Sequence, residues 1–323
     1  MKTAERVASE PQAQPASPVR RPRSRFRRFL SLVNLKASPY LLVSPYFILF
    51  LIFGAFPLGF TLWVSLHDWQ LAGDKEWIGL DNYQFLLTNE RFRMTVVNTI
   101  GMFVLATVPQ LLLALMVANA LNKRFRGRLL IRLGVLIPMV TSVVAVAIVF
   151  SQIYGTKYGM VNWFLGNFGV DPIDWRKTSL ASWVAISSMV DWRWTGYNAI
   201  IYLAAMQAIP RVLYEAATVD GASSRRQFWH ITVPQLKPVI IFTVFISTIG
   251  GLTLFAEPMM FNSGRLDGGT TGQFQTVAMY IVQAFRERNN YGLAAAAAWL
   301  LFALIVVIAL ANYLVVNRIR ESR

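Results

Sequence analysis

The chain has 323 residues, of which 55% are hydrophobic and only 15% are charged, whereas soluble domains carry roughly 25% charged residues. This apolar content excludes a chain that is disordered over most of its length, and the absence of cysteine excludes disulfide frameworks, thiolate metal sites and cysteine nucleophiles. The formal net charge is +15, and in so apolar a chain we expect it to mark one side of a membrane rather than a nucleic-acid surface.

Residues 1–36 form a basic segment that is rich in proline, alanine, serine and arginine. Such a composition lacks the periodicity of a packed element, so we expect a disordered tail on the cytoplasmic side. Its arginine run directly precedes the first apolar stretch, where it would fix the membrane topology and contact anionic lipid.

Six stretches of the remaining chain are free or almost free of charged residues. Each is close to or longer than the about 20 residues that a membrane helix needs. Only helices and closed barrels satisfy their backbone in lipid, and the alternating strands of a barrel are absent from the pattern. The predicted fold class is therefore all-α, a polytopic membrane protein with six transmembrane helices in residues 37–317. The expected spans are about 39–66, 95–122, 132–155, 180–208, 237–257 and 291–316.

Lysine and arginine are unevenly distributed between the segments that connect these spans. The tail, the second and fourth connections and the C-terminal residues 318–323 hold 21 of the 31, while the other three connections hold nine. Positive charge accumulates on the cytoplasmic side. Both termini and the loop 209–236 are therefore predicted to be cytoplasmic.

The fourth span contains the two charges that lie deep within an apolar stretch, Asp191 and Arg193. Intramembrane charge is costly and indicates function, and nearby aromatic and amide side chains suit a site for a sugar. The candidate substrate residues here are Asp191, Trp192, Arg193, Trp194, Tyr197 and Asn198. Helical spacing places Asp191 on one face with Trp194 and Asn198. The alternative, that these residues tie the span to other helices or to a second subunit, is equally consistent with the sequence.

The cytoplasmic loop after this span contains a short amphipathic segment, a glycine and a second short segment that ends at a proline. Gly221 suits the turn between two helices, and Ser223 or Ser224 suits the cap of the second. The fixed pattern is Glu-Ala-Ala, three residues, Gly, nine residues, Ile, one residue, Val and Pro.

This pattern resembles the EAA loop of ABC importer permeases, with Val233 in place of the usual Leu. The resemblance implies that the residues coupling this loop to an ATPase are Glu215, Ala216, Ala217, Asp220, Gly221, Ile231 and Pro234. The stretches Tyr214–Ala222, Phe228–Pro234, Trp192–Asn198 and Tyr291–Ala294 resemble the carbohydrate, maltose-type branch of these permeases. The resemblance spans roughly residues 40–317.

The resemblance implies the type I ABC importer permease fold and a place in the bacterial cytoplasmic membrane. The loop would form a coupling helix that binds an ATPase subunit, and Glu215 would pair with a basic residue of that subunit or, within its own helix, with Arg211. The implied partners are a second permease in a heterodimer, two ATPase subunits and an extracytoplasmic sugar-binding protein. This chain has no Gly-Lys dipeptide and so no P-loop. ATP and magnesium are therefore expected in the partner ATPase, with no cofactor and no enzymatic activity in this chain.

The last two spans add three expectations. Glu257, at the end of the fifth span, either faces the external opening or is solvated beyond the helix end, and the second interpretation is slightly favoured. The loop 262–273 is glycine-rich, so we expect it to be flexible. Ala294–Ala298 places five small residues in the sixth span, which suits a subunit interface.

The predicted function is a permease subunit for ATP-driven sugar import by alternating access. The stretch Gly251–Pro258 most resembles permeases for β-linked gluco-oligosaccharides such as cellobiose. The alternatives are an importer for another polar solute, such as a polyol or a glycerol phosphodiester, or an ion-gradient-driven secondary transporter. Against the last, no half-to-half repeat is evident.

Overall fold

The structure, a computed structural model, describes residues 25–70, 75–123 and 126–321. The expected tail therefore lies in large part, at residues 1–24, outside the described residues. The chain divides into two compact units, residues 1–59 and 60–323. The first contains helix α1 (Arg25–Phe50), the π-helical turn η1 (Leu51–Ala55) and the start of helix α2 (Phe56–Ser65).

Residues 25–36 are helical, so the expectation of disorder is wrong for this part of the tail. Arginine, leucine and lysine are good helix formers, and neither glycine nor proline interrupts residues 25–38. The helix of the first span therefore continues into the basic segment.

The second unit begins with the rest of α2. A short antiparallel hairpin follows, in which His67 pairs with Trp77, and the chain then continues as helices. Its elements up to the fourth predicted span are β1 (His67–Asp68), β2 (Glu76–Trp77), α3 (Asp81–Thr88), α4 (Glu90–Asn122), α5 (Arg128–Val140), α6 (Val143–Ile153), α7 (Met160–Gly166) and α8 (Ser179–Gln207). The remaining elements are α9 (Arg211–Val219), α10 (Ser224–Gln227), the π-helical turn η2 (Phe228–Thr232), α11 (Val233–Leu252), α12 (Ala256–Phe261), α13 (Val277–Arg286) and α14 (Tyr291–Glu321).

Side chains cap several of these helices and explain where they begin. Asn89 accepts a hydrogen bond from the backbone N–H of Phe92 at the start of α4. Thr178 caps α8, and Thr276 caps α13. Each cap satisfies a backbone donor that has no partner within its helix.

Within the described residues, four helical stretches are long and apolar enough to cross a membrane, namely Ser38–Ser65, Glu90–Asn122, Ser224–Leu252 and Tyr291–Leu314. The pair α5 and α6 makes a fifth if it is counted as one span. Helix α8 has 29 residues, but the polar residues in its middle lower its hydropathy and it does not join this set.

The third and fifth predicted spans differ from the expectation in their detail. The third is not one helix, because α5 and α6 meet at a bend of 93°. At this bend Thr141 has extended backbone and Ser142 is also non-helical. The fifth ends at Leu252 rather than at 257, and α12 follows after a short break.

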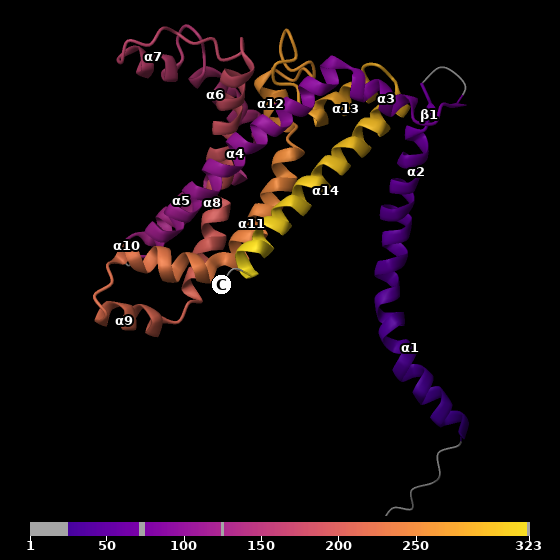
Figure 1. Ribbon diagram of the computed structural model, residues 1–323, viewed down its shortest axis with the longest axis horizontal. Coiled ribbons are helices and arrows are strands. Elements are labelled where there is room, and N and C mark those ends of the chain that lie inside the picture. The colour runs from indigo at the N-terminus through magenta and orange to yellow at the C-terminus, as the bar shows by residue number, and fades with distance from the viewer. Residues whose placement is uncertain (1–24, 71–74, 124–125, 322–323) are drawn as a thin grey trace, which may run out of the picture. The chain divides into compact units, whose positions relative to one another are not determined.

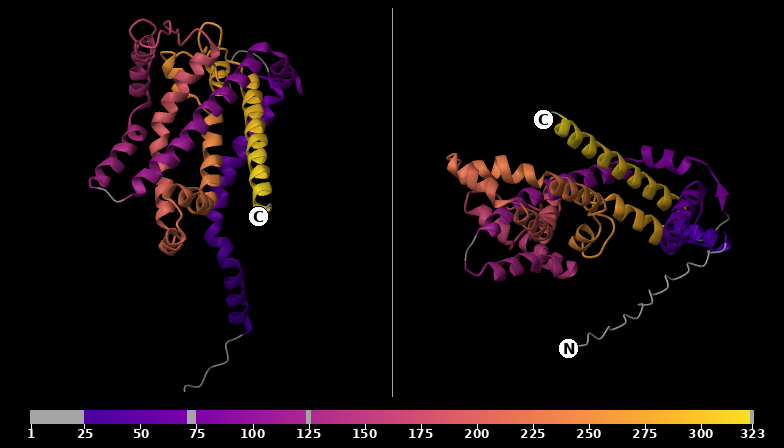
Figure 2. Two further views of the ribbon diagram at one scale, coloured as in Figure 1. Left: turned by 60° about the vertical axis from the view of Figure 1, so that its left-hand side comes forward. Right: turned by 90° about the horizontal axis from the view of Figure 1, so that it is seen from below.

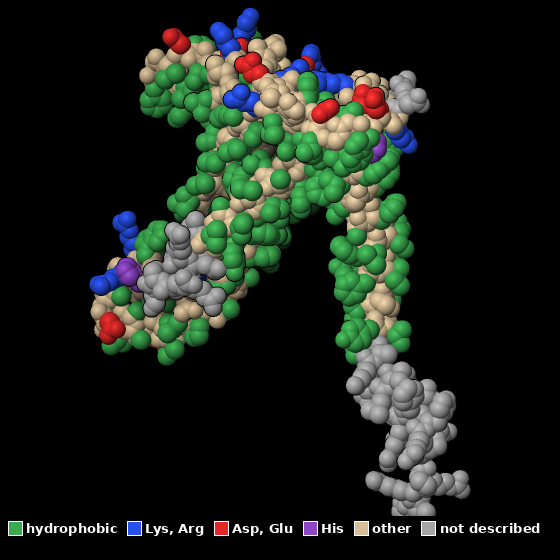
Figure 3. Space-filling view, turned by 45° about the vertical axis from the view of Figure 1, so that its right-hand side comes forward, with side chains coloured by type: hydrophobic (Ala, Val, Ile, Leu, Met, Phe, Trp, Pro, Cys, Tyr) green, Lys and Arg blue, Asp and Glu red, His purple; other side chains and the backbone are tan. Residues whose placement is uncertain are grey.

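The core of the second unit is the packing of α4 against α8. One cluster joins Met102 and Ala106 to Ala185 and Ile186, and another, closer to α9, joins residues 114–121 to residues 199–206. Figure 1 shows α9 and α10 at one end of these helices and α7, α12 and α13 at the other, and the first view of Figure 2 agrees. In Figure 3, charged side chains gather at these two ends, while the surface between them is mostly hydrophobic.

The sixth predicted span packs inside its own chain at the small residues expected to form a subunit interface. Ala294–Ala297 are buried, and Ala296 and Ala297 lie in a cluster with Phe92 and Tyr280. For these four alanines the interface expectation is wrong, because their size serves close packing within the unit.

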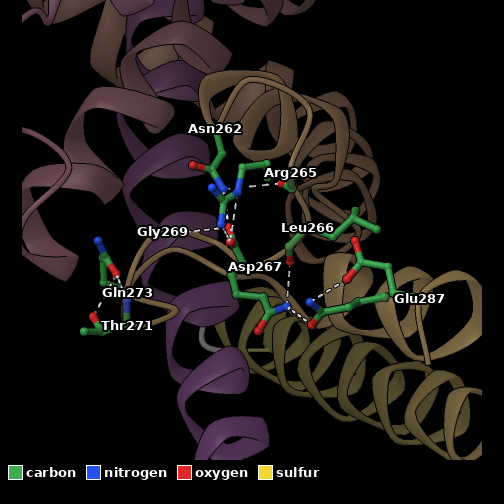
Figure 4. Close-up of polar contacts among 10 residues, drawn as sticks. Asn262, Arg265, Leu266, Asp267, Gly269, Thr271, Gln273 and Glu287 are labelled. Atoms are coloured by element: carbon green, nitrogen blue, oxygen red, sulfur yellow. Dashed lines mark hydrogen bonds and ion pairs between the residues drawn. The ribbon is translucent and has the colours of Figure 1, made fainter.

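The glycine-rich loop after α12 is held by side-chain hydrogen bonds, so the expectation of a flexible loop is also wrong (Figure 4). The Asp267 carboxylate accepts hydrogen bonds from Asn262, Arg265 and the backbone N–H of Gly269. Burial alone would raise the pKa of Asp267, but these hydrogen bonds and the Arg265 charge outweigh it and hold the pKa below its ordinary value.

A second group of contacts anchors the same loop from its far side. The buried Gln275 side chain donates to the Leu266 carbonyl and to Gln283, at 2.6 and 2.8 Å. Gln283 in turn donates to Glu287 at 2.9 Å. Buried amides with satisfied hydrogen bonds fix a loop in one conformation.

Candidate functional site

A cavity of about 330 Å³ lies between α4, α8, α11 and α12. Its wall combines aromatic side chains with side chains that can form hydrogen bonds: Trp194, Tyr197, Phe255, Gln110, Asn198, Thr107, Ser247, Thr253 and Glu257. Gly250 and Gly251 also line it. Apolar faces with a few well-placed polar groups are typical of a site for a small molecule. This combination suits a solute that has both C–H faces and hydroxyl groups.

A larger hollow, of about 610 Å³, lies near α6 and the end of α12. It contains none of the residues that the sequence predicts for a substrate site. The smaller cavity is therefore the better candidate.

The structure brings four of the seven predicted substrate residues together. Trp194, Tyr197 and Asn198 of α8 and Glu257 of α12 line the same cavity. The other three, Asp191, Trp192 and Arg193, do not line it. The predicted helical face is therefore correct for Trp194 and Asn198 but does not extend to Asp191.

Sequence reasoning missed the contribution of α4. Thr107 and Gln110 lie in the wall of the cavity, and both side chains are buried. An amide in the middle of an otherwise apolar membrane span is a signal that sequence alone offers, and Gln110 follows Pro109 in such a span.

Arg193 and Glu257 form a buried ion pair, with Arg193 Nη1 2.5 Å from Glu257 Oε1. Only 13% of the Arg193 side chain and 8% of the Glu257 side chain are exposed. The favoured expectation that Glu257 is solvated beyond a helix end is therefore wrong. The pair links α8 to α12 at the cavity, 64 residues apart in the chain.

Helix α8 also carries three buried polar atoms that have no hydrogen-bond partner among the described residues, namely Asp191 Oδ1, Arg193 Nε and Thr195 Oγ1. A buried group of this kind costs about 1–3 kcal/mol. Three such atoms lie within five residues, and buried polar groups without a partner are rare in folded proteins.

Gly196 sets the position of this segment against α5. A Cβ atom on Gly196 would lie 1.8 Å from the carbonyl oxygen of Val135. Only glycine permits this approach, so the cavity-lining residues on either side of it are held in place by α5.

The loop with the Glu-Ala-Ala pattern folds into a helical hairpin at the opposite end of α8. Gly221 has a φ of +75°, and Ser223 accepts a hydrogen bond from the backbone N–H of Arg226, which confirms the predicted turn and cap. The Tyr214 and Thr232 hydroxyls lie 2.9 Å apart, and Gln227 donates to Thr218 at 3.0 Å. These contacts tie α9 to α10 and η2.

Helix α9 has no buried residue. Glu215 and Ala216 are exposed and Ala217 is partly exposed, and Val219 is 88% exposed. Among the described residues no ion pair joins Glu215 to Arg211 within 4.0 Å, so this structure gives no support to the pairing within the helix. The remaining pattern residues Ile231 and Pro234 are partly buried, where η2 joins α11.

Comparison with known proteins agrees with this arrangement. The trehalose/maltose transport system permease MalF of Thermococcus litoralis is 34% identical, over 88% of this chain and 94% of that protein. The sulfoquinovosyl glycerol transport system permease SmoG of Agrobacterium fabrum is 32% identical, over 92% of this chain and 95% of that protein. A crystal structure of a bacterial alginate ABC transporter, in complex with an alginate pentasaccharide-bound periplasmic protein, shares the fold. Its TM-score is 0.75 at 24% identity, covering 90% of this chain and 98% of that one.

The family model for the inner membrane component of binding-protein-dependent transport systems matches residues 110–321. This range includes the cavity-lining parts of α8, α11 and α12 and the whole Glu-Ala-Ala hairpin. The chain belongs to the family of binding-protein-dependent transport system inner membrane components.

Proposed function

We propose that this chain is the membrane-spanning permease subunit of an ATP-driven, binding-protein-dependent importer of oligosaccharides. The observation that carries the proposal is the cavity between α4, α8, α11 and α12, whose wall mixes aromatic faces with hydrogen-bonding groups. The relatives named for trehalose/maltose and sulfoquinovosyl glycerol transport support a sugar as cargo.

The proposed topology has six membrane crossings. It counts α8 as the fourth and the bent pair α5 and α6 as the third. Both termini and the α9–α10 hairpin then lie in the cytoplasm of a bacterium, which agrees with the excess of lysine and arginine in those segments. The polar middle of α8 is compatible with a crossing because Asn198 borders a cavity and Arg193 is buried and paired with Glu257.

The sugar would cross along the cavity wall. Trp194 and Tyr197 would stack against its C–H faces, while Gln110 and Asn198 would bind its hydroxyl groups. Neither amide has a hydrogen-bond partner among the described residues, so both remain free to bind a solute. Asp191, Trp192 and Arg193 do not line the cavity, and their proposed role is to hold this part of α8 in position.

The α9–α10 hairpin would couple this path to a partner ATPase that binds ATP and magnesium. Glu215, Ala216, Ala217, Asp220 and Gly221 would dock in a groove of that subunit, as their exposure permits. Ile231 and Pro234 would hold the hairpin against α11. ATP binding would open the cavity outward, and hydrolysis would return it to the inward-open state, which is alternating access. This chain itself would hold no cofactor and catalyse no reaction.

The working importer would contain a second, similar permease, two ATPase subunits and an external sugar-binding protein. A cellobiose-like β-linked gluco-oligosaccharide is the first cargo to test. A polyol or a glycerol phosphodiester would suit the same cavity chemistry less well, because each offers fewer ring faces to the aromatic side chains.

Gentle extraction of the tagged chain from its native membrane tests this function. We expect an ATPase with a P-loop and a second permease with a Glu-Ala-Ala loop to co-purify, and sugar uptake to stop on ATP depletion. A chain that purifies alone in several mild detergents, or uptake that survives ATP depletion but collapses with the ion gradient, would instead indicate a secondary transporter.

A further inference from the structure

The wall of the cavity carries charge of one sign. Among the described residues that line it, Glu257 is the only carboxylate, and no lysine or arginine lines it. The positive member of the ion pair, Arg193, is bonded to Glu257 but does not line the cavity. A solute in the cavity is therefore closer to the carboxylate than to the guanidinium.

The ion pair leaves one carboxylate oxygen available to a solute. Glu257 Oε1 accepts the hydrogen bond from Arg193 Nη1, and among the described residues Oε2 has no partner. A carboxylate oxygen is an acceptor only, so Oε2 can bind a hydroxyl donor but not a second anion. Charge-assisted hydrogen bonds of this kind are stronger than neutral ones.

The fold does not determine which sign of charge a cargo of this family carries. One relative is named for trehalose and maltose, which are uncharged, and another for a sulfonated sugar. The structural neighbour imports alginate, an acidic polysaccharide. Selection by charge must therefore come from individual side chains.

We propose that Glu257 makes this cavity select uncharged oligosaccharides and disfavour those with a carboxylate or sulfonate group. Arg193 is a positioning residue, because its ion pair holds the Glu257 carboxylate in the cavity wall. Its positive charge also partly offsets the negative charge of Glu257, so the cavity does not require a cationic cargo. This inference rests on the proposed function and adds to it the chemical class of the cargo.

Equilibrium binding to the intact importer in lipid nanodiscs tests the proposal. The external binding protein is left out, because it makes its own selection. The probes are maltose, lactose and cellobiose, each paired with the analogue in which a terminal CH₂OH is oxidised to a carboxylate. The wild-type importer should prefer the neutral member of a pair about tenfold, since unit charges a few ångströms apart repel measurably even when a counter-charge lies behind one of them.

Two variants separate charge from shape. Glu257→Gln keeps the side-chain volume and leaves Arg193 as the nearby charge, so the preference should shift toward the acidic sugar. The double variant Arg193→Gln with Glu257→Gln removes both buried charges, and its preference should fall to about one. It also keeps the test valid if the single variant fails to assemble. Glu287→Gln, at an exposed glutamate beyond the cavity, should keep the wild-type preference.

The outcomes separate this inference from the proposed function. Equal binding of both members of each pair by the wild type, or an unchanged preference in the double variant, overturns the role of Glu257 while sugar import stands. Failure of the wild-type importer to bind any member of the three pairs contradicts the proposed function and the inference together.

Discussion

Replacing Gly221 with alanine should weaken coupling without unfolding the protein. Gly221 has a φ of +75°, and a Cβ atom there would meet nothing within 4 Å, so the only cost is backbone strain. For a residue with a side chain that cost is about 1–2 kcal/mol, which lowers the population of the native turn about 5–30-fold. Because α9 has no buried residue to oppose the change, we expect a several-fold loss of ATP-driven uptake in proteoliposomes.

Gly127 provides a matched control for this prediction. It has a φ of +81° and equally open surroundings, but it lies at the start of α5 and outside the Glu-Ala-Ala hairpin. Gly127→Ala should carry the same strain and leave uptake close to wild type, and Gly221→Asn should recover much of the loss because asparagine tolerates this conformation. Equal losses in Gly127→Ala and Gly221→Ala, with the importer still assembled, would refute the assignment of coupling to the hairpin.

Three further predictions concern stability. Arg193→Met should lower the free energy of unfolding in detergent by about 3–5 kcal/mol, because it leaves the Glu257 carboxylate buried and unpaired. Arg193→Met with Glu257→Met should recover most of that loss, and equal values for the single and double variants would argue against the pair. Gly196→Ala should cost about 1–3 kcal/mol through overpacking against α5, whereas Gly134→Ala, where a Cβ meets nothing within 4 Å, should cost far less in the same unfolding measurement. Asp267 has a lowered pKa in the folded loop, so its ionised form stabilises the loop above the unfolded value of about 3.9, and this stabilisation is lost as the pH falls through the folded value. The protection factor of the loop amides, which compares their hydrogen exchange with that of an unfolded peptide at the same pH, should therefore fall at acid pH in the wild type, and Asp267→Asn should lower it already at neutral pH.

The sequence was sufficient to predict most of the long helices and the α9–α10 hairpin because these depend on local signals. A long charge-free run is a helix in lipid, and a glycine between two short amphipathic segments is a turn. Trp194 and Asn198 were placed on one wall by helical spacing alone.

Features that depend on partners distant in the chain could not be predicted in this way. The bend between α5 and α6 falls at Thr141 and Ser142, and hydropathy carries no information on the direction in which a helix runs. The burial of Glu257 could not be predicted, because its partner, Arg193, lies on another helix. The order of the glycine-rich loop could not be predicted for the same reason. Asn98, which is distant in the chain on α4, donates hydrogen bonds to the backbone carbonyls of Gly272 and Gln275 and so anchors the loop.

The continuity of α8 has a mechanical consequence. The helix is unbroken over 29 residues, which at about 1.5 Å per residue makes a rod roughly 43 Å long, with Trp194 and Asn198 near its middle and α9 starting a few residues beyond its end. The hydrogen bond from Tyr214 to Thr232 ties α9 back to η2 and so to α11, which also lines the cavity. The hairpin thus connects α8 and α11, two helices that both line the cavity. A tilt of α8 by about 10° about its midpoint would move its end by roughly 4 Å, so in the proposed cycle a displacement of the hairpin on that scale would tilt α8 and shift the cavity wall.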